Sequence, residues 1–182
     1  MKVLVLALAI GVIVSLAGDA AIAQEQKGDA TGVQHGGLEL SLVSQKRSYK
    51  RNDQFKLQVM LVNPTSKPVY VFGTLDWGYS ASLMFYIRDS SGREIEPKLS
   101  PDSQTYATAD DKSAFVKLEP DHFFGTTYFA PLSFMNLNKP GRYAISVEYI
   151  SPFSIAEVEL KPFLGKESGP LKSNVVWIEV VR

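Results

Sequence analysis

In several short segments of the chain, large apolar residues recur at every second position. In residues 142–149 these are Tyr143, Ile145, Val147 and Tyr149. A period of two is typical of a β-strand that buries one face and exposes the other. The same pattern occurs in residues 38–42, 55–61 and 83–88. We therefore predict strands in all four segments.

Other segments are too short to show a period but are rich in β-branched and aromatic residues, which favours strands. They are residues 68–72, 115–118, 123–129 and 175–181, with a further short strand expected near 156–160. Turn-forming residues separate the strands at 63–66, 89–92 and 119–121. The turn at 89–92 predicts a hairpin that returns through residues 94–96. Two long loops are expected, at 98–113 and 151–173.

No segment shows the period that marks an amphipathic helix. Many short strands with turns between them, and no helices, predict an all-β protein. We expect a single antiparallel immunoglobulin-like β-sandwich of roughly seven to nine strands, formed by residues 38–182.

The N-terminal segment has the pattern of a signal peptide. A basic Lys2 precedes an apolar run over residues 3–18, and Ala21 and Ala23 provide the small residues that signal peptidase reads before Gln24. The run is shorter than the roughly 20 residues that a membrane span needs. We predict a signal peptide at residues 1–23 and a polar, flexible leader at 24–37. The protein is then exported and is not inserted in a membrane after cleavage.

The composition narrows the compartment and the partners. The chain has no cysteine, so it forms no disulfides, and its Asn63-Pro64-Thr65 sequence is not a glycosylation site because of the proline. These features favour a bacterial periplasm or exterior. Acidic and basic residues are equal in number, 19 of each. A balanced charge gives no electrostatic surface for nucleic acid, which excludes it as a partner.

One short motif predicts a structural role for three residues. Pro140, Gly141 and Tyr143 follow one another closely before a predicted late strand. In sandwiches of this kind, a tyrosine early in a late strand hydrogen-bonds to the backbone just upstream, which is called a tyrosine corner. We expect Gly141 to supply the turn and Tyr143 to supply the hydroxyl.

Three stretches together resemble a known family. They are Leu61–Val69, Leu137–Tyr143 and Gly169–Ile178. The chain resembles the non-catalytic immunoglobulin-like accessory domain of bacterial deuterolysin-type metallopeptidases. More loosely, it is similar to the intracellular proteinase inhibitor family of bacilli. The resemblance covers most of residues 38–181 and implies a sandwich. It implies no catalytic residues, because the zinc-binding His-Glu-x-x-His motif of those peptidases is missing from this sequence.

The sequence contains no recognisable active site. His35 and His122 are too few for a zinc site without cysteine. Gly78–Ser82 partly matches the nucleophile elbow of hydrolases but lacks its last glycine and the following helix. Asp110 and Asp111, with Asp102 nearby, do not have the spacing of a calcium loop. We predict no metal, no cofactor and no enzymatic activity.

The most distinctive polar–aromatic cluster lies in a predicted loop. Asp76, Trp77 and Tyr79 stand between two strands, beside Gly78. Exposed Trp and Tyr side chains anchor many protein interfaces and stack on sugar rings. The alternative is that Trp77 folds back and covers one end of the sandwich.

These observations lead to three functional hypotheses. The first is a non-catalytic module that binds a protein partner through its end loops, with Asp76, Trp77 and Tyr79 in the contact. The second is a proteinase inhibitor that acts through the loop at 98–113 or 151–173. The third is a carbohydrate-binding module that uses the loop aromatics. The sequence leaves the oligomeric state open.

Overall fold

A computed structural model of the chain describes residues 37–77, 82–98 and 107–182. The predicted signal peptide and nearly all of the predicted leader lie outside these residues, and both stay predictions. In the described part of the chain, no helix is long and apolar enough to cross a membrane.

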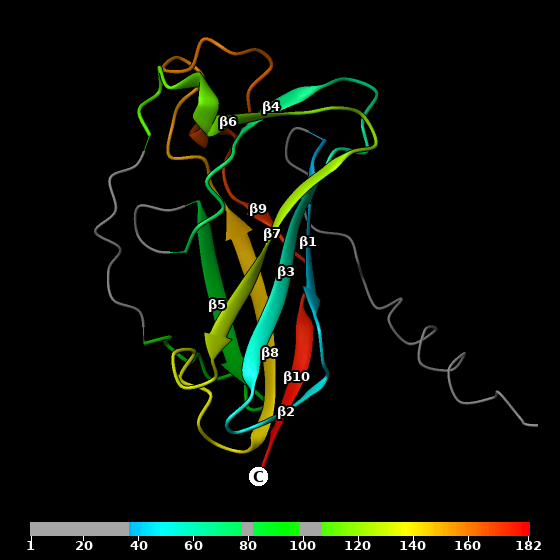
Figure 1. The fold of residues 1–182 in the computed structure, drawn as a ribbon, viewed down its shortest axis with the longest axis vertical. Helices are drawn as coiled ribbons and strands as arrows, with labels where there is room; N and C mark the ends of the chain where they lie inside the picture. Colours follow the sequence, from blue (N-terminus) through cyan, green and yellow to red (C-terminus); the bar gives the residue numbers. More distant parts are fainter. Residues whose placement is uncertain (1–36, 78–81, 99–106) are drawn as a thin grey trace, which may run out of the picture.

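Two β-sheets pack face to face, and β3 and β7 cross in front of β5 and β8 in Figure 1. The first sheet has the strand order β1-β3-β7, with β1 at Glu39–Ser44, β3 at Gln54–Val62 and β7 at Phe123–Pro131. The second has the order β2-β10-β8-β5 with β9 beside β8, its strands being β2 (Ser48–Lys50), β5 (Leu83–Asp89), β8 (Gly141–Tyr149), β9 (Leu171–Lys172) and β10 (Val176–Val181).

This connectivity is that of an immunoglobulin-like sandwich. The first, third and seventh strands form one sheet, and the late strands β8 and β10 join β5 in the other. The predicted all-β sandwich is therefore confirmed, with ten strands in the described residues rather than seven to nine. One pairing differs from the prediction, because β2 pairs with β10 in parallel. The first part of the chain changes sheets after β1, and this switch brings β2 alongside the C-terminal strand.

The core lies between the sheets and is formed by the alternating apolar positions. Leu57, Val59 and Leu61 of β3 are fully buried, as are Ile145 and Val147 of β8. Burying side chains of this size stabilises the fold by about 1.5–3 kcal/mol each. The alternation in the sequence thus locates the inner face of each main strand.

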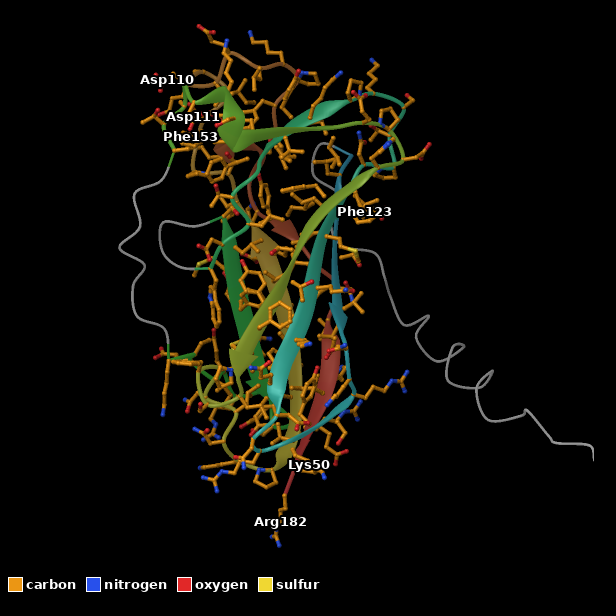
Figure 2. All side chains as sticks on the ribbon, viewed as in Figure 1. Lys50, Asp110, Asp111, Phe123, Phe153 and Arg182 are labelled. Carbon is orange, nitrogen blue, oxygen red and sulfur yellow. The ribbon has the colours of Figure 1, made fainter. Side chains whose placement is uncertain are left out.

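A smaller unit closes one end of the sandwich, at the top of Figure 1. It contains β4 (Val69–Phe72) paired with β6 (Phe115–Leu118), the short 3-10 helices at Lys112–Ala114 and Lys166–Ser168, and the connection from 151 to 170. A second apolar cluster holds this end cap together, and its buried members are Phe72, Phe115, Val158 and Phe163. Figure 2 shows Phe153, Asp110 and Asp111 at this end, and Lys50 and Arg182 at the other.

Two expected strands do not form in the described residues. One was expected in the 151–170 connection and the other after the turn at 89–92. Residues 156–160 form turns instead of a strand, because Val158 points into the aromatic cluster while its neighbours face solvent. Residues 94–96 form only an isolated bridge from Glu94 to Arg88, with one further hydrogen bond from Ile95 N–H to the Ile87 carbonyl (2.8 Å).

Tyr149 connects the end cap to the sandwich. Its hydroxyl accepts a hydrogen bond from the Phe72 N–H (2.9 Å) and donates one to the Phe72 carbonyl (3.2 Å), and the side chain is fully buried. Burial raises the pKa of Tyr149 above its ordinary value, so the hydroxyl stays protonated and remains a donor. One side chain of the central strand thereby satisfies a buried backbone unit of β4.

Asn63 connects two turns of the same region. Its side-chain amide donates to the carbonyls of Lys67 and Leu118 (both 2.9 Å), and its oxygen accepts from the Thr65 N–H (3.1 Å) and hydroxyl (2.7 Å). Asn63 is completely buried, and every polar group of its side chain has a partner. The predicted turn at 63–66 is therefore fixed by an internal amide rather than by solvent.

The three residues of the predicted tyrosine corner lie where β8 begins. The Tyr143 hydroxyl donates to the Lys139 carbonyl (2.8 Å), four residues upstream. Gly141 is the first residue of β8, and its backbone lies outside the positive-φ region. The left-handed residue of this connection is Asn136, with φ of 58°. Gly141 therefore adopts a backbone conformation that other residues can also adopt, and its role in the turn stays a prediction.

The outer edges of two strands are covered by local groups. Along β1, the Asn174 side chain accepts from the Leu42 N–H (2.8 Å) and donates to the Leu42 carbonyl (2.9 Å), as a neighbouring strand would. Along β5, the Leu83 N–H donates to the Asp76 carbonyl (3.1 Å), and residues 93–95 cover the other end. Covered edges do not offer free backbone groups to another chain.

Polar contacts hold the 151–170 connection in place. The Glu157 carboxylate accepts from the Ser154 N–H (2.7 Å) and from Lys166 Nζ (3.3 Å). Hydrogen bonds from Ser154, and then the Lys166 charge, lower the pKa of Glu157 to about 2. The ionised form of Glu157 is therefore the one that the folded connection binds.

The hydrogen bond of Tyr149 to the Phe72 N–H is buried, whereas that of Tyr143 is partly buried. We therefore expect their removal to lower the free energy of unfolding by different amounts. Tyr149→Phe should lower the free energy of unfolding by about 2 kcal/mol, because it leaves a buried N–H of β4 without a partner. Tyr143→Phe should cost about 1 kcal/mol, because water can reach the Lys139 carbonyl that loses its donor. Urea unfolding followed by circular dichroism measures both values. Equal losses would contradict the assignment of Tyr149 as the connection between end cap and sandwich.

The Glu157 contacts predict a pH-dependent stability. The folded pKa is about 2, below the ordinary value of 4.5. The contribution of Glu157 is therefore complete above about pH 4.5 and is lost as the pH falls toward 2. Glu157→Gln should lower the melting temperature at pH 7, and the difference from the native chain should shrink steadily below pH 4.5. Thermal unfolding of both chains across this pH range tests the prediction. A difference in melting temperature that does not change with pH would contradict it.

Candidate binding groove on the outer face of the second sheet

The outer face of the second sheet is hollowed along its central strand. Inward-facing residues of β8 are large, but the outward-facing Ala144 and Ser146 are small. On one side, β10 presents Val175, just before the strand, and Trp177; on the other side, β5 presents Tyr86 and Arg88. The low floor between higher side chains forms a shallow depression, and we call these six residues the outer groove.

The strand register places the walls directly beside the floor. Ala144 is paired with Trp177 on β10 and with Arg88 on β5, and Ser146 is paired with Tyr86. Side chains at directly paired positions lie on the same face of the sheet, close enough to contact each other. The width of the outer groove is therefore set by one strand of small residues.

Trp177 is the main apolar side chain of the outer groove. It is 46% exposed, and Val175 is 53% exposed, although both belong to a strand segment whose alternate residues are buried. The Arg142 guanidinium lies 4.6 Å from the centre of the Trp177 ring, in a cation–π contact. This contact holds the indole in place while leaving nearly half of the residue open to solvent.

Glu148 closes one end of the outer groove. Its carboxylate accepts from the Tyr86 hydroxyl (3.0 Å) and pairs with Lys172 Nζ (2.8 Å), and its side chain is only 15% exposed. Burial and then the Glu148 contact raise the pKa of Tyr86. Both carboxylate oxygens already have partners, so Glu148 is held as a fixed acceptor at the end of the outer groove rather than as a free base.

The groups of this surface favour binding. Trp, Tyr and Arg are the residue types most enriched at the energetic centres of interfaces, and all three line or border the outer groove. In the described parts of the chain, no group of three or more His, Asp or Glu residues is placed to hold a metal ion. The exposed ring of Trp177 can pack against an apolar or aromatic group of a ligand, and the polar side chains around the outer groove can form hydrogen bonds with that ligand.

Two of the three residues predicted to bind a partner lie away from the outer groove. Asp76 and Trp77 are in the connection between β4 and β5, where the Trp77 ring is half-buried and lies 4.8 Å from the Phe85 ring. Phe85 in turn contacts Tyr128 edge-on at 5.2 Å, so Trp77 extends an aromatic cluster at the side of the sandwich. The Asp76 carboxylate accepts from the Trp77 N–H (2.8 Å). Tyr79 lies outside the described residues, and a binding role for this loop stays a prediction.

The acidic residues Asp110 and Asp111, whose spacing does not match a calcium loop, make local contacts. Asp111 accepts from the N–H (3.1 Å) and hydroxyl (2.6 Å) of Ser113, and Asp110 accepts from the Thr108 hydroxyl. The Thr108 contact lowers the pKa of Asp110. Asp102 is outside the described residues. The contacts of Asp110 and Asp111 are those of a turn before the first 3-10 helix.

The sequence carries a signal for the exposure of Trp177. Val176, Ile178 and Val180 alternate in the last strand, and the latter two are fully buried. Residues in the opposite phase, including Glu179, must then face solvent. A tryptophan in phase with a charged residue is an exposed tryptophan, and this pattern identifies Trp177 without a structure.

No protein-family model and no curated protein matches the sequence. Among solved structures, the chain is similar to a β-glucosidase from Erythrobacter marinus, with 14% identity, a TM-score of 0.40, and coverage of 79% of this chain and 15% of that one. It is also similar to the CARDB domain of a Pyrococcus furiosus protein (12% identity, TM-score 0.38, 79% and 92% covered). A third is the sporulation control protein Spo0M from Bacillus subtilis (14% identity, TM-score 0.37, 81% and 50% covered).

The chain spans about one sixth of the β-glucosidases that it matches. TM-scores of this size say nothing about the function of the chain. The resemblance to the peptidase accessory domain stays a prediction, since no match singles out that family.

Proposed function

We propose that this chain is an exported, non-catalytic binding module that holds a protein partner in the outer groove. The observation that carries the proposal is Trp177, which is 46% exposed on a sheet face where the small Ala144 and Ser146 of the central strand leave a low floor. A large exposed ring beside a low floor provides a pocket wall, and no side chain of the described residues fills the space beside it.

A protein is the partner that the rim favours. Val175 and Trp177 form an apolar centre, and Arg88, Arg142 and Lys172 supply charged groups around it. An apolar centre with a polar rim is the usual anatomy of a protein interface. This proposal moves the contact from the end loops to the face of the sheet, because Trp77 and the 151–170 connection both pack against the body of the domain.

A glycan is a second candidate, supported by the same indole together with the fixed acceptor Glu148. Aromatic rings stack on sugar faces, and a carboxylate held by two partners is a rigid acceptor for a hydroxyl group. The inhibitor hypothesis has less support from the 151–173 segment, because Phe163 and Leu164 are buried and the Leu164 N–H donates to the Tyr70 carbonyl (3.0 Å). Export itself follows from the signal-peptide pattern alone and remains part of the proposal.

Substitution of Trp177 should remove binding without unfolding the domain. Trp177→Ala should weaken the partner complex on the order of 30-fold, as for a central interface residue. The free energy of unfolding should change by no more than about 1 kcal/mol, because the side chain is half-exposed. Phe134→Ala is the matched control, since Phe134 is 54% exposed and lies outside the outer groove.

The measurement is a cross-linked pull-down from an envelope extract of the source organism, followed by titration calorimetry with the protein that is retained. A partner kept by the native chain and by Phe134→Ala but lost by Trp177→Ala supports the proposal. A partner kept equally by all three chains removes the outer groove as its site. If no protein is retained, a glycan panel with the same three chains tests the second candidate.

A further inference from the structure

The strand β7 has one edge with no partner in the described residues. Its nine residues pair with β3 along their whole length. On the opposite side, no backbone hydrogen bond from residues 123–130 to any described residue is present. The edges of β1 and β5 are covered by Asn174 and by residues 93–95, so β7 differs from both.

This edge also lacks the features that keep free edges from pairing. Natural edge strands are usually short or carry charged residues, bulges or prolines. The strand Phe123–Pro131 is long and has no charged residue, and its only proline is at the last position. Phe123 is 69% exposed and Phe129 is 59% exposed, which makes them the two most exposed large apolar residues of the described chain. Figure 2 labels Phe123 at the start of the strand.

The sequence of β7 is nearly symmetric about Thr126. Phe123 and Phe129 lie three positions to either side, and Phe124 and Tyr128 lie two positions to either side. In an antiparallel pair of identical strands centred on Thr126, Phe123 lies opposite Phe129 of the partner subunit. Directly opposite residues share a face of the sheet. Each exposed ring then meets an exposed ring, and each half-buried aromatic residue meets a half-buried aromatic residue.

We propose that two copies of this chain pair through β7, antiparallel, about a two-fold axis at Thr126. The register suits the backbone, because it pairs odd positions with odd and even with even. In a strand, the residues at every second position direct their N–H and C=O groups to the same edge. In this register, the residues that do so in one copy lie opposite the residues that do so in the other copy, so their backbone groups can hydrogen-bond. The two three-stranded sheets become one continuous six-stranded sheet, with the same surface used by both subunits.

A second copy is favoured over another partner by charge and by area. An uncharged strand does not repel itself across a two-fold axis, whereas a charged one would. The exposed parts of four phenyl rings supply up to roughly 500 Å², about half of the ~1,000 Å² that a specific interface needs. The paired main chains and the Thr127 side chain, which lies on the same face as the two phenyl rings, supply further area. The outer groove lies on the other sheet, so this inference stands independently of the proposed function.

A pair of charge variants tests the register as well as the association. In Phe123→Lys/Phe129→Lys, like charges face each other twice across the axis, and the dissociation constant of the dimer should rise at least on the order of tenfold. In Phe123→Glu/Phe129→Lys, opposite charges face each other twice, and the dimer should persist and weaken with added salt. Both variants remove the same two rings and place the same lysine beside Lys56, the residue paired with Phe129 on β3, so they differ only in the charge at position 123. Phe134→Lys is the control at an exposed phenylalanine outside β7.

Sedimentation equilibrium of protein purified from expression of the full chain measures the dissociation constants. A native chain that remains monomeric at every concentration overturns the proposal. A dimer that resists the Lys/Lys variant, or one that both double variants abolish equally, also overturns the proposed pairing. Circular dichroism confirms that each variant is folded.

Cysteine cross-linking provides a second, independent measurement, because the native chain has no cysteine. Thr126→Cys places two thiols directly opposite each other at the axis, within the Cα separation that a disulfide requires. Thr127→Cys places them beyond about 7 Å, where a disulfide does not form. A disulfide-linked dimer from Thr126→Cys and not from Thr127→Cys supports the register. The reverse result, or equal cross-linking, contradicts it.

Discussion

The structure depends on the alternation of side-chain size along β8. This strand pairs with β5, β9 and β10 and carries large residues on its inner face. The middle of its outer face carries the small Ala144 and Ser146, between Arg142 and Glu148. The inner residues Tyr143, Ile145, Val147 and Tyr149 hold the core, the corner and the end cap together. The outer residues Ala144 and Ser146 leave the space that becomes the outer groove. The same period of two therefore determines both the stability of the sandwich and the shape of its proposed binding surface.

The two sheets present different surfaces. The second sheet presents an aromatic ring and charged groups over a low floor, and its outer strand β5 is covered along its edge. The first sheet presents a long uncharged edge with two exposed phenylalanines. The outer groove lies on the second sheet and the β7 edge belongs to the first, so the two proposed contacts use different residues.

The eight longer strands could be predicted from the sequence because period-two alternation and β-branched composition survive in segments of four or more residues. The strands β2 and β9 were missed since two or three residues are too few to show a pattern. Residues 156–160 were mistaken for a strand because apolar Val158 and Leu160 alternate with acidic neighbours, and tertiary packing against Phe163 decided their conformation instead. Residues 94–96 follow the predicted turn at 89–92, but they form only one bridge to β5, and a polar loop continues from there instead of a strand.

The candidate site was less predictable for a physical reason. Composition draws attention to a tryptophan beside a glycine in a loop, yet Trp77 contacts Phe85 and belongs to the packing of the sandwich. Trp177 sits within an apolar strand and is easily assigned to the core unless the phase of its neighbours is followed. The groove itself requires Ala144, Ser146 and Trp177 to be adjacent across two strands, and strand register is a long-range property that a linear pattern does not contain. The contacts of Tyr143 and Lys139, by contrast, span four residues and are local enough to be expected.

The hydroxyl of Tyr149 has a further consequence for how the molecule behaves as it opens. The end cap has its own aromatic cluster and could form a separate unfolding unit, of the kind that exchanges its amides before the rest of a domain. Its innermost strand is bonded at Phe72 to a side chain that belongs to the central strand of the sandwich. The cap therefore cannot open at β4 without exposing a buried hydroxyl of the core. Tyr149 in this way couples the cap to the sandwich, together with the Asn63 amide that donates to the Leu118 carbonyl of β6.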